Sequence, residues 1–412
     1  MDEQTVVNDH HLFDEAAYLR LYPDIARAIS EGREVSAWDH FDRHGRNEGR
    51  KLNDFEADYY LRSYPAAAQE IAAGLAASPF EHYRIYGRPR GFLSNPKAVR
   101  PANAAALRSP FGGLWPDQPN AADMLQGKLE IGQVTEPQAE KLRFWMANGF
   151  VILESAIPPS LADRAALDLD RAYAGAFPEL KFECHAVARD HIHWQPEINP
   201  EPAKALDIHH FSPAIRDLMF ADPISDFLGL IFESRAFASQ TLGFLRGSAQ
   251  EGHQDSAYVP YTIPRQFAAT WTALEDVTIG AGELFYYPGS HRFEDFIYSE
   301  RYKSVHEAQR ITGDQSIREQ VERHVRSLVE RAEQHGIPKA PFAARKGDVL
   351  VWHADLVHGG NPVSRATTRK SIVTHYCPKH LSPLFSEHLR TRLWDYKGHR
   401  YTTSHYGNEP LA

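Results

Sequence analysis

The sequence has only two cysteines among its 412 residues, Cys184 and Cys377. Two thiols cannot build a disulfide framework or a cysteine-rich zinc site. Any metal site must therefore be built from imidazole and carboxylate groups. So few thiols also suit a reducing compartment, and we expect a cytoplasmic protein.

Positive charge is also in short supply. The chain carries 45 Lys and Arg against 54 Asp and Glu, a net charge of −9. This balance argues against nucleic acid as a partner, because phosphate-backbone binding requires a basic surface. No apolar run reaches the roughly 18 residues of a membrane span. The acidic start lacks the apolar core of a signal peptide, so we expect neither a leader nor a membrane span.

The first hundred residues contain an internal repeat. The segment 13–49 returns at 55–91, and every matched pair is 42 residues apart, including His40 and His82. A fixed period of this size indicates a duplicated supersecondary unit. Each copy predicts a helix, a glycine turn and a second short helix around its histidine, and we interpret both histidines as structural. We expect the aromatic positions to form the contact between the copies.

This unit resembles short repeats attached to bacterial glycosyltransferases and other polysaccharide-processing enzymes. The first copy keeps the Tyr-Pro-Asp run at 22–24 and the Glu-Gly-Arg run at 48–50, whereas Ala66 replaces the aspartate in the second. The resemblance implies a helical docking or assembly module over 1–92 that binds a protein partner. It also suggests a saccharide-linked substrate for the rest of the chain.

Composition divides the remaining sequence. Residues 93–127 are rich in proline, asparagine, alanine and glycine, which predicts a linker. The segment 128–412 begins with helical patterns and then changes to short strands separated by glycine and proline, which predicts a mainly β domain of the sandwich or barrel type with flanking helices. We predict helices at 136–147, 159–175 and 211–230, and strands at 149–153, 236–245, 268–275, 284–287, 348–353 and 371–376.

One helical segment interrupts the predicted strands. Residues 294–340 contain a capping-box pattern at Ser316 and Glu319, followed by apolar residues at helical spacing. Gly336 and Pro338 close this helix. Two roles stay open, a lid over the mouth of the β domain or a solvated cover for an exposed sheet.

The chain contains three His-x-Asp pairs, His40/Asp42, His253/Asp255 and His353/Asp355. On a strand, the two side chains of such a pair lie on one face. With a distant histidine they form a 2-His-1-carboxylate triad, which leaves positions open on Fe(II) for other ligands. The first pair lies in a predicted helix, where i and i+2 point to different faces. His353 and His358 differ by five, so both are ligands only if the strand bends, and spacing does not choose between them.

Residues 136–380 resemble the phytanoyl-CoA dioxygenase family of Fe(II)/2-oxoglutarate oxygenases. The matching blocks are Gly-Phe-Val-Ile-Leu at 149–153, His-Gln-Asp at 253–255, Trp-Thr-Ala-Leu-Glu-Asp at 271–276, the run from Gly282 to His291, and Gly347-Asp348 followed by His358-Gly-Gly-Asn and Arg369. The resemblance implies a double-stranded β-helix (jelly roll) that binds Fe(II), 2-oxoglutarate and O2. It assigns His253, Asp255 and His358 as metal ligands and catalytic centre.

The same resemblance assigns the cosubstrate contacts. Arg369 takes the role of binding the C5 carboxylate of 2-oxoglutarate, for which a planar guanidinium is suited. Arg365 is the competing candidate. Gln240 stands where related hydroxylases place a glutamine that contacts 2-oxoglutarate, and a glutamine satisfied within the sheet is the alternative.

One departure from the family pattern concerns a hydroxyl group. Family members often have serine two residues after the distal histidine, where this chain has Gly360. Thr270 or Ser371 would have to substitute, or the arginine acts alone. The carboxylate ligand Asp255 is present, so no ligand position is vacant for a halide. The resemblance therefore favours hydroxylation, with release of succinate and CO2, over halogenation.

Two further segments carry polar or aromatic side chains near the expected site. His191, His193 and Trp194 lie in a loop that either lines the substrate mouth or forms plain surface. We interpret the turn at 288–291 as architectural, with His291 exposed.

The sequence therefore predicts an Fe(II)- and 2-oxoglutarate-dependent dioxygenase that hydroxylates a small molecule or a saccharide-linked substrate. An acyl-CoA substrate is less favoured, because no cluster of Lys and Arg marks a nucleotide-phosphate site. The alternative from another class is a catalytically inert β-helix protein that acts as a binding or scaffold partner in polysaccharide assembly. Iron-dependent decarboxylation of 2-oxoglutarate separates the two.

Overall fold

The computed structural model describes residues 13–83 and 109–406, except 14, 54, 64, 73, 75, 189, 366 and 385–391. The chain divides into two compact units, Met1–Pro110 and Phe111–Ala412, which are described separately. Both cysteines are buried and unpaired. Among the helices described, none is both long and apolar enough to cross a membrane.

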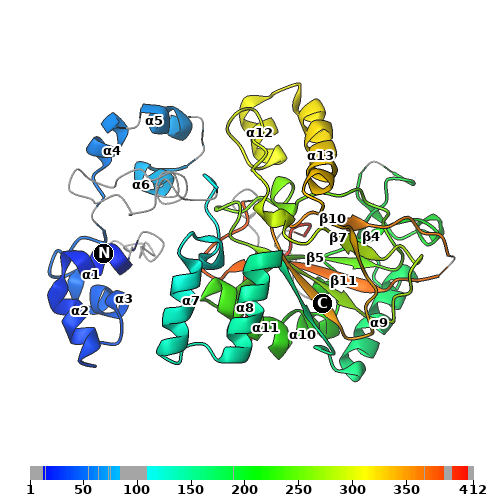
Figure 1. Cartoon of the computed structure of the whole chain (residues 1–412), viewed down its shortest axis with the longest axis horizontal. Coiled ribbons are helices and arrows are strands. Elements are labelled where there is room, and N and C mark those ends of the chain that lie inside the picture. Colours follow the sequence, from blue (N-terminus) through cyan, green and yellow to red (C-terminus); the bar gives the residue numbers. More distant parts are fainter. Residues whose placement is uncertain are drawn as a thin grey trace, which may run out of the picture. The chain divides into compact units, whose positions relative to one another are not determined.

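The N-terminal unit contains the two repeat copies as short helices (Figure 1). The first copy forms α1 (Glu15–Leu21), α2 (Pro23–Ser30), α3 (Ala37–His40) and the π-helical turn η2 (Phe41–Gly45), and the second forms α4 (Ala57–Ser63), α5 (Pro65–Ala72) and α6 (Pro79–His82). Where the sequence predicted one helix before each glycine turn, there are two. Pro23 and Pro65 start the second helix of each copy, because proline is tolerated in the first turn but not in a helix interior.

The aromatic contacts described in the repeat unit lie within each copy, and the expected contact between the copies stays a prediction. In the first copy the rings of Phe13 and Tyr18 lie 5.1 Å apart. The Tyr18 hydroxyl lies 3.0 Å from Nδ1 of His40, and the matched Tyr60 hydroxyl lies 2.8 Å from Nδ1 of His82. Both histidines are buried, as their structural interpretation requires.

The second unit is built on two sheets, which form the predicted jelly roll (Figure 1). The large sheet has the order β1-β9-β6-β11-β5-β4-β2-β3, with β13 joining β5 and β12, and the small sheet has the order β10-β7-β8. All the pairings are antiparallel except that of β13 with β5. The strands are β1 (Phe150–Leu153), β2 (Lys181–Glu183), β3 (Ile192–His193), β4 (Lys204–Leu206), β5 (Ala236–Phe244), β6 (Ala268–Ala273), β7 (Leu284–Tyr286), β8 (Ala340–Phe342), β9 (Val349–His353), β10 (His358–Gly360), β11 (Ser371–Pro378), β12 (Trp394–Tyr396) and β13 (His399–Tyr401).

Side-chain alternation along the central strands separates two cores. On β6, Trp271 joins the cluster between the two sheets, together with Leu284 of β7. Ala268, which lies on the opposite face of the same strand, belongs to the cluster under the helices. These helices are α8 (Glu136–Asn148), α9 (Pro159–Tyr173), α10 (Pro213–Met219) and α11 (Asp222–Phe232). The helix predicted at 211–230 is thus two helices, and Pro223 lies in the first turn of the second.

The predicted linker at 93–127 is corrected in its C-terminal part. The short turn η5 (Trp115–Asp117) and the helix α7 (Ala121–Glu130) belong to the second unit. Trp115 and Leu125 join its main core, and the indole Nε1 of Trp115 donates to the carbonyl of Leu230 at 2.8 Å. Composition suggested a linker, but two large apolar side chains were enough to anchor this segment.

The insertion at 294–340 is helical, as predicted. It forms α12 (Val305–Thr312) and α13 (Ile317–Gln334), which stand beyond the small sheet in Figure 1. Leu328 of α13 packs with Phe285 of β7 and with Val357, so this helix covers the outer face of the small sheet. The cover interpretation therefore holds for α13.

Candidate metal centre

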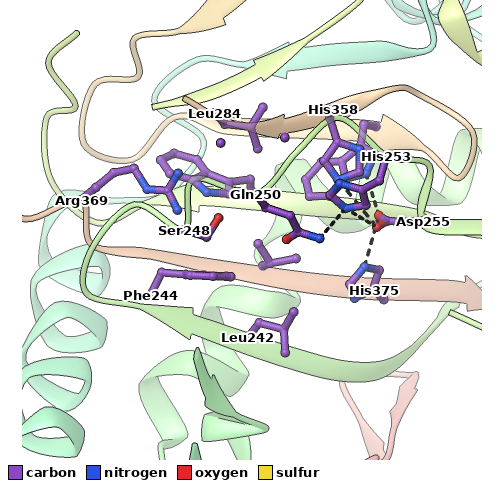
Figure 2. Close-up of a pocket in the computed structure, with 15 residues that line it drawn as sticks. Leu242, Phe244, Ser248, Gln250, His253, Asp255, Leu284, His358, Arg369 and His375 are labelled. Carbon is purple, nitrogen blue, oxygen red and sulfur yellow. Dashed lines mark hydrogen bonds and ion pairs between the residues drawn. The ribbon is translucent and has the colours of Figure 1, made fainter. Parts of the chain in front are cut away.

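His253, Asp255 and His358 meet at one end of the space between the sheets (Figure 2). One ligand atom from each lies within 4.8 Å of the others. Nε2 of His253 and Nε2 of His358 each lie 3.6 Å from Oδ1 of Asp255. Two reciprocal backbone hydrogen bonds of 2.9 and 3.0 Å join residues 253 and 358, so the loop after β5 and the strand β10 hold the two histidines together.

Both imidazole rings are oriented by backbone carbonyl groups. Nδ1 of His253 lies 2.9 Å from the carbonyl oxygen of Glu251, and Nδ1 of His358 lies 2.9 Å from that of Leu356. Because a carbonyl only accepts, each Nδ1 carries the proton and each Nε2 keeps a lone pair for a metal.

The carboxylate of Asp255 is oriented in the same way. Its Oδ2 accepts from the indole Nε1 of Trp352 at 2.9 Å and from Nε2 of His375 at 3.3 Å, which leaves Oδ1 for a cation. Burial opposes ionisation of Asp255, but the imidazoles of His358 and His375 hold its pKa well below the ordinary value. Burial lowers the pKa of His358 to about 4. The acid is thus ionised and this ligand histidine neutral near pH 7, the states that bind a metal.

This donor set fits a divalent first-row metal such as Fe(II). Two imidazole nitrogens and one carboxylate oxygen converge on one point, the arrangement of a facial triad with open positions. All three residues line a pocket of about 60 Å³ whose opposite end is formed by Arg369. His375, which the sequence interpretation missed, lines the same pocket. The inward positions of β11 recur every second residue, but this period does not say which of them faces the metal.

Arg369 is buried at the far end of this pocket. Its Nη1 donates to the carbonyl of Gly282 at 2.6 Å, while Nε has no partner in the described part of the chain. The guanidinium lies 5.6 Å from the ring centre of Phe244 and 5.5 Å from that of Trp271. Burial lowers its pKa to about 10, so it stays charged near pH 7. The competing candidate Arg365 is exposed and does not line the pocket.

A hydroxyl group lies beside Gly360, but the sequence suggested other residues for it. A Cβ atom at position 360 would lie 3.1 Å from Oγ of Ser248, which lines the pocket near Arg369 (Figure 2). Thr270 points away, because its Oγ1 lies 3.4 Å from the hydroxyl of Tyr376 on the helix-covered face. The Ser371 hydroxyl is buried, has no hydrogen-bond partner among the described residues and does not line the pocket. No sequence signal links positions 248 and 360, which come together only in the fold.

Gln240 lies in a neighbouring pocket rather than beside Arg369. Its Nε2 donates to Nδ1 of His375 at 3.0 Å, and its Oε1 accepts from Oγ of Ser404 at 3.3 Å. Both groups of the Gln240 amide are thus hydrogen-bonded within the protein, which is the alternative that the sequence left open, and its contact with 2-oxoglutarate stays a prediction. Gln240 is therefore connected to Asp255 indirectly, because His375 is hydrogen-bonded to both.

Two other histidines of the motif blocks are structural. His353 is fully buried, with Nε2 3.1 Å from Oδ2 of Asp117. The chain turns between β9 and β10, so His353 and His358 do not share a site. The expectation that His291 is exposed is wrong: it is 3% exposed and packs against Gly149, and burial lowers its pKa to about 3.

The loop at 191–194 is mostly surface. His191 and His193 are exposed, and the indole of Trp194 donates to the carbonyl of Tyr173 at 2.7 Å. Only His191 approaches the neighbouring pocket, with its ring centre 5.1 Å from that of His405.

Comparison with known proteins supports this assignment. The family model described as phytanoyl-CoA dioxygenase (PhyH) matches residues 145–371, more than half of the chain. Phytanoyl-CoA dioxygenase 1 of Oryza sativa subsp. japonica is 24% identical over 266 residues, which cover 55% of this chain and 85% of the relative. A phytanoyl-CoA dioxygenase of Arabidopsis thaliana is 29% identical over 89 residues, 21% of this chain and 31% of that protein.

Solved structures that this chain resembles in part include two oxygenase-type proteins. The non-haem α-ketoglutarate-dependent epimerase SnoN from nogalamycin biosynthesis has 16% identity and a TM-score of 0.43, covering 60% of this chain and 85% of that one. EctD from S. alaskensis has 20% identity and a TM-score of 0.42, covering 60% and 77%. The match to the family model places the entry strand, the metal pocket and most of the jelly roll within one family. The chain belongs to the phytanoyl-CoA dioxygenase family of non-haem iron, 2-oxoglutarate-dependent oxygenases.

Proposed function

We propose that the protein uses Fe(II), 2-oxoglutarate and O2 to hydroxylate a small molecule or a saccharide-linked substrate, with release of succinate and CO2. One observation carries this proposal. The pocket has three metal-ligand atoms at one end and a buried guanidinium without an anionic partner among the described residues at the other. A dicarboxylic oxoacid has complementary ends, one for the metal and one for the arginine.

Each side chain has a separate task in this proposal. When bound, the iron and the cosubstrate supply the oxidising chemistry, which the protein orients. His253, Asp255 and His358 hold the metal, and Asp255 fills the position that a halide would need. Arg369 pairs with the C5 carboxylate of 2-oxoglutarate, and the apolar walls between exclude water.

We assign the missing serine hydroxyl to Ser248. Its Oγ occupies the space that a side chain at Gly360 would enter, and no hydrogen bond to another described residue engages it. A hydroxyl there donates to the same carboxylate that Arg369 binds. A hydrogen bond to a charged group contributes about 1.5–3 kcal/mol, so Ser248→Ala should weaken 2-oxoglutarate binding about 10- to 100-fold.

Isothermal titration of 2-oxoglutarate into Mn(II)-loaded protein measures this binding without turnover. Arg369→Ala should weaken binding more than Ser248→Ala, and Arg365→Ala, which removes an exposed guanidinium, should leave it unchanged. Gly360→Ser alone should also weaken binding by crowding Ser248. The double variant Ser248→Ala/Gly360→Ser should bind better than Ser248→Ala. Equal affinity of wild type and Ser248→Ala would exclude the role of Ser248.

The proposed function itself is tested without knowing the substrate. Anaerobic addition of Fe(II) and 2-oxoglutarate should give a visible charge-transfer absorption, and admission of air should then produce succinate. Asp255→Ala should lose both signals. Succinate formation that does not require iron, or a wild-type protein that binds Fe(II) but never consumes 2-oxoglutarate, would overturn the proposal and favour the inert scaffold.

Other expectations stay proposals. We propose that the repeat unit docks a protein partner and that the protein acts in the cytoplasm, where its two buried thiols remain reduced.

A further inference from the structure

A second and larger pocket lies beside the metal centre. It has a volume of about 320 Å³, and its walls come from β5, the loop after the His-x-Asp pair, α12 of the insertion and the C-terminal segment. The ring of Tyr258 in its wall lies 5.9 Å from the ring of His253. Gln240 in the same wall is bonded to His375, which contacts Asp255. A molecule in this pocket therefore lies one side chain away from the metal ligand His253, across Tyr258.

One wall of the pocket contains a histidine held in a fixed orientation. The carboxylate of Asp207 is fully buried, and its Oδ2 accepts from Nδ1 of His405 at 2.9 Å and from the backbone N–H groups of residues 404 and 405. Its Oδ1 accepts from the backbone N–H of Thr241 on β5 at 3.0 Å. Because Nδ1 is engaged, Nε2 is the ring nitrogen of His405 that remains for a ligand.

Other polar groups of the wall are also available. In the described residues, the Tyr258 hydroxyl, the His306 ring and the Arg310 guanidinium have no hydrogen-bond partner, and all three line the pocket. Each of them can donate a hydrogen bond to a ligand, and Arg310 carries a positive charge. Glu307 is the one carboxylate in the wall, and it is buried with interactions of its own. The pocket thus offers an excess of donors over acceptors.

We propose that this pocket binds the substrate, and that the substrate is an oxygen-rich polar molecule with an acidic group, either carboxylate or phosphate. Nε2 of His405 binds an oxygen atom of it, and Arg310 and His306 face the acidic group. This inference rests on the proposed function, because it assigns the pocket to the substrate of the adjacent iron centre. It also gives α12 a role as a pocket wall, whereas α13 covers the sheet.

An acyl chain would need a continuous apolar surface. Three residues of the wall are apolar, Val259, Pro260 and Leu384, and the other lining residues carry polar or charged groups. Burying the donors of this wall against a hydrocarbon would leave them without partners, at a cost for each group. An acidic sugar satisfies them instead.

Ligand-observed NMR on protein loaded with Mn(II) and 2-oxoglutarate tests the proposal with four probes: glucuronate, glucose 1-phosphate, glucose and octanoate. We expect at least one acidic sugar to bind about tenfold more tightly than glucose, and octanoate not to bind. The two acidic probes distinguish a carboxylate from a phosphate. Octanoate binding in preference to both acidic sugars, or no binding of either acidic sugar, would overturn the proposal.

Two variants locate the binding. Arg310→Gln changes an exposed residue of α12 and should weaken the acidic probe about tenfold; His405→Phe should weaken glucose as well. Arg318→Gln removes the same charge from an exposed position on α13 and should change neither. Unchanged probe affinity in both pocket variants would contradict the assignment. The 2-oxoglutarate affinity of the same samples reports on the metal site separately. A protein that does not bind 2-oxoglutarate would contradict the proposed function, whereas a protein that binds 2-oxoglutarate but no acidic probe would contradict only the substrate assignment.

Discussion

Two His-x-Asp pairs lie in the same domain and do different work. Asp255 faces imidazole rings, and its Oδ1 is free for a metal. Asp355 is buried between Arg265 and Lys303 and also accepts from Ser256. Both carboxylates have a pKa below the ordinary range, but among the described residues Lys and Arg pair with Asp355 and not with Asp255. A buried carboxylate without such cations requires one from outside.

The histidines of the two pairs differ in the same way. His253 uses Nδ1 for a backbone carbonyl, and its Nε2 lies in the metal pocket, where its one hydrogen-bond contact among the described residues is the side-chain amide of Gln250 at 3.3 Å. His353 uses both nitrogens within the protein: Nε2 contacts Asp117, and Nδ1 accepts from the backbone N–H of Asp355. The His-x-Asp pattern alone therefore does not identify a metal site. The hydrogen bonds of the histidine ring nitrogens distinguish the metal-binding pair from the structural pair.

The largest effect should come from removing the carboxylate of the metal pair. Asp255→Ala should abolish Fe(II) binding and succinate formation. Thermal unfolding of the metal-free protein should change less than in Asp355→Ala, because this substitution leaves no Lys or Arg unpaired. Metal content by mass spectrometry and succinate by chromatography measure this. If Asp255→Ala retained iron and turnover, the assignment of the metal to the 253/255 pair rather than the 353/355 pair would be contradicted.

The matched change in the structural pair should act on stability instead. Asp355→Ala leaves the buried guanidinium of Arg265 and the ammonium of Lys303 without their carboxylate. Removing one partner of a buried ion pair costs about 3–5 kcal/mol, so the free energy of unfolding, measured by urea titration, should fall by that amount. Normal stability combined with loss of metal would assign Asp355, not Asp255, to the metal.

An intermediate effect should follow from the residue that orients Asp255. His375→Ala removes a donor to Oδ2, and loss of such a partner typically costs about 10- to 100-fold in metal affinity or activity. Competition between the protein and a chelator for Fe(II) measures the affinity. Trp352→Phe removes the other donor to the same oxygen and should give a loss of similar size; two unaffected variants would show that these hydrogen bonds do not position the carboxylate.

The smallest effect should be a pH dependence of stability that comes from Asp117, the partner of His353 in the structural pair. Burial opposes ionisation of Asp117, but His353 and Arg265 lower its pKa to about 2. Because the folded value lies below the ordinary one, its contribution to stability is complete above about pH 4 and is lost as the pH falls toward 2; it amounts to about 2 kcal/mol. Asp117→Asn should reduce the change of the unfolding free energy with pH across this window, measured by urea titration at several pH values. An unchanged pH dependence would exclude Asp117 as its source.

Sequence patterns predicted the long elements of the fold well. The strands β5, β6, β9 and β11 and the helices α8 and α9 lie where apolar periodicity placed them. The short strands β2, β3, β4, β8, β10, β12 and β13 were missed, because two or three residues carry no period. Composition suggested a linker where Trp115 anchors a segment to the core.

The metal centre was predictable only in part. Spacing indicated His253 and Asp255, and family resemblance, not geometry, chose His358 over His353. The turn between β9 and β10 that separates these two histidines has no signature in their spacing. Ser248, His375 and Asp207 reach their sites through strand pairing and loop closure over long sequence distances, and no local pattern marks them.

The most direct test of the central claim is a crystal structure of the Mn(II)-loaded protein with anomalous diffraction data. We expect one strong peak bonded to Nε2 of His253, Nε2 of His358 and Oδ1 of Asp255. A peak beside His353, Asp117 or Asp355, or a fully loaded protein with no peak between the three predicted atoms, would contradict it.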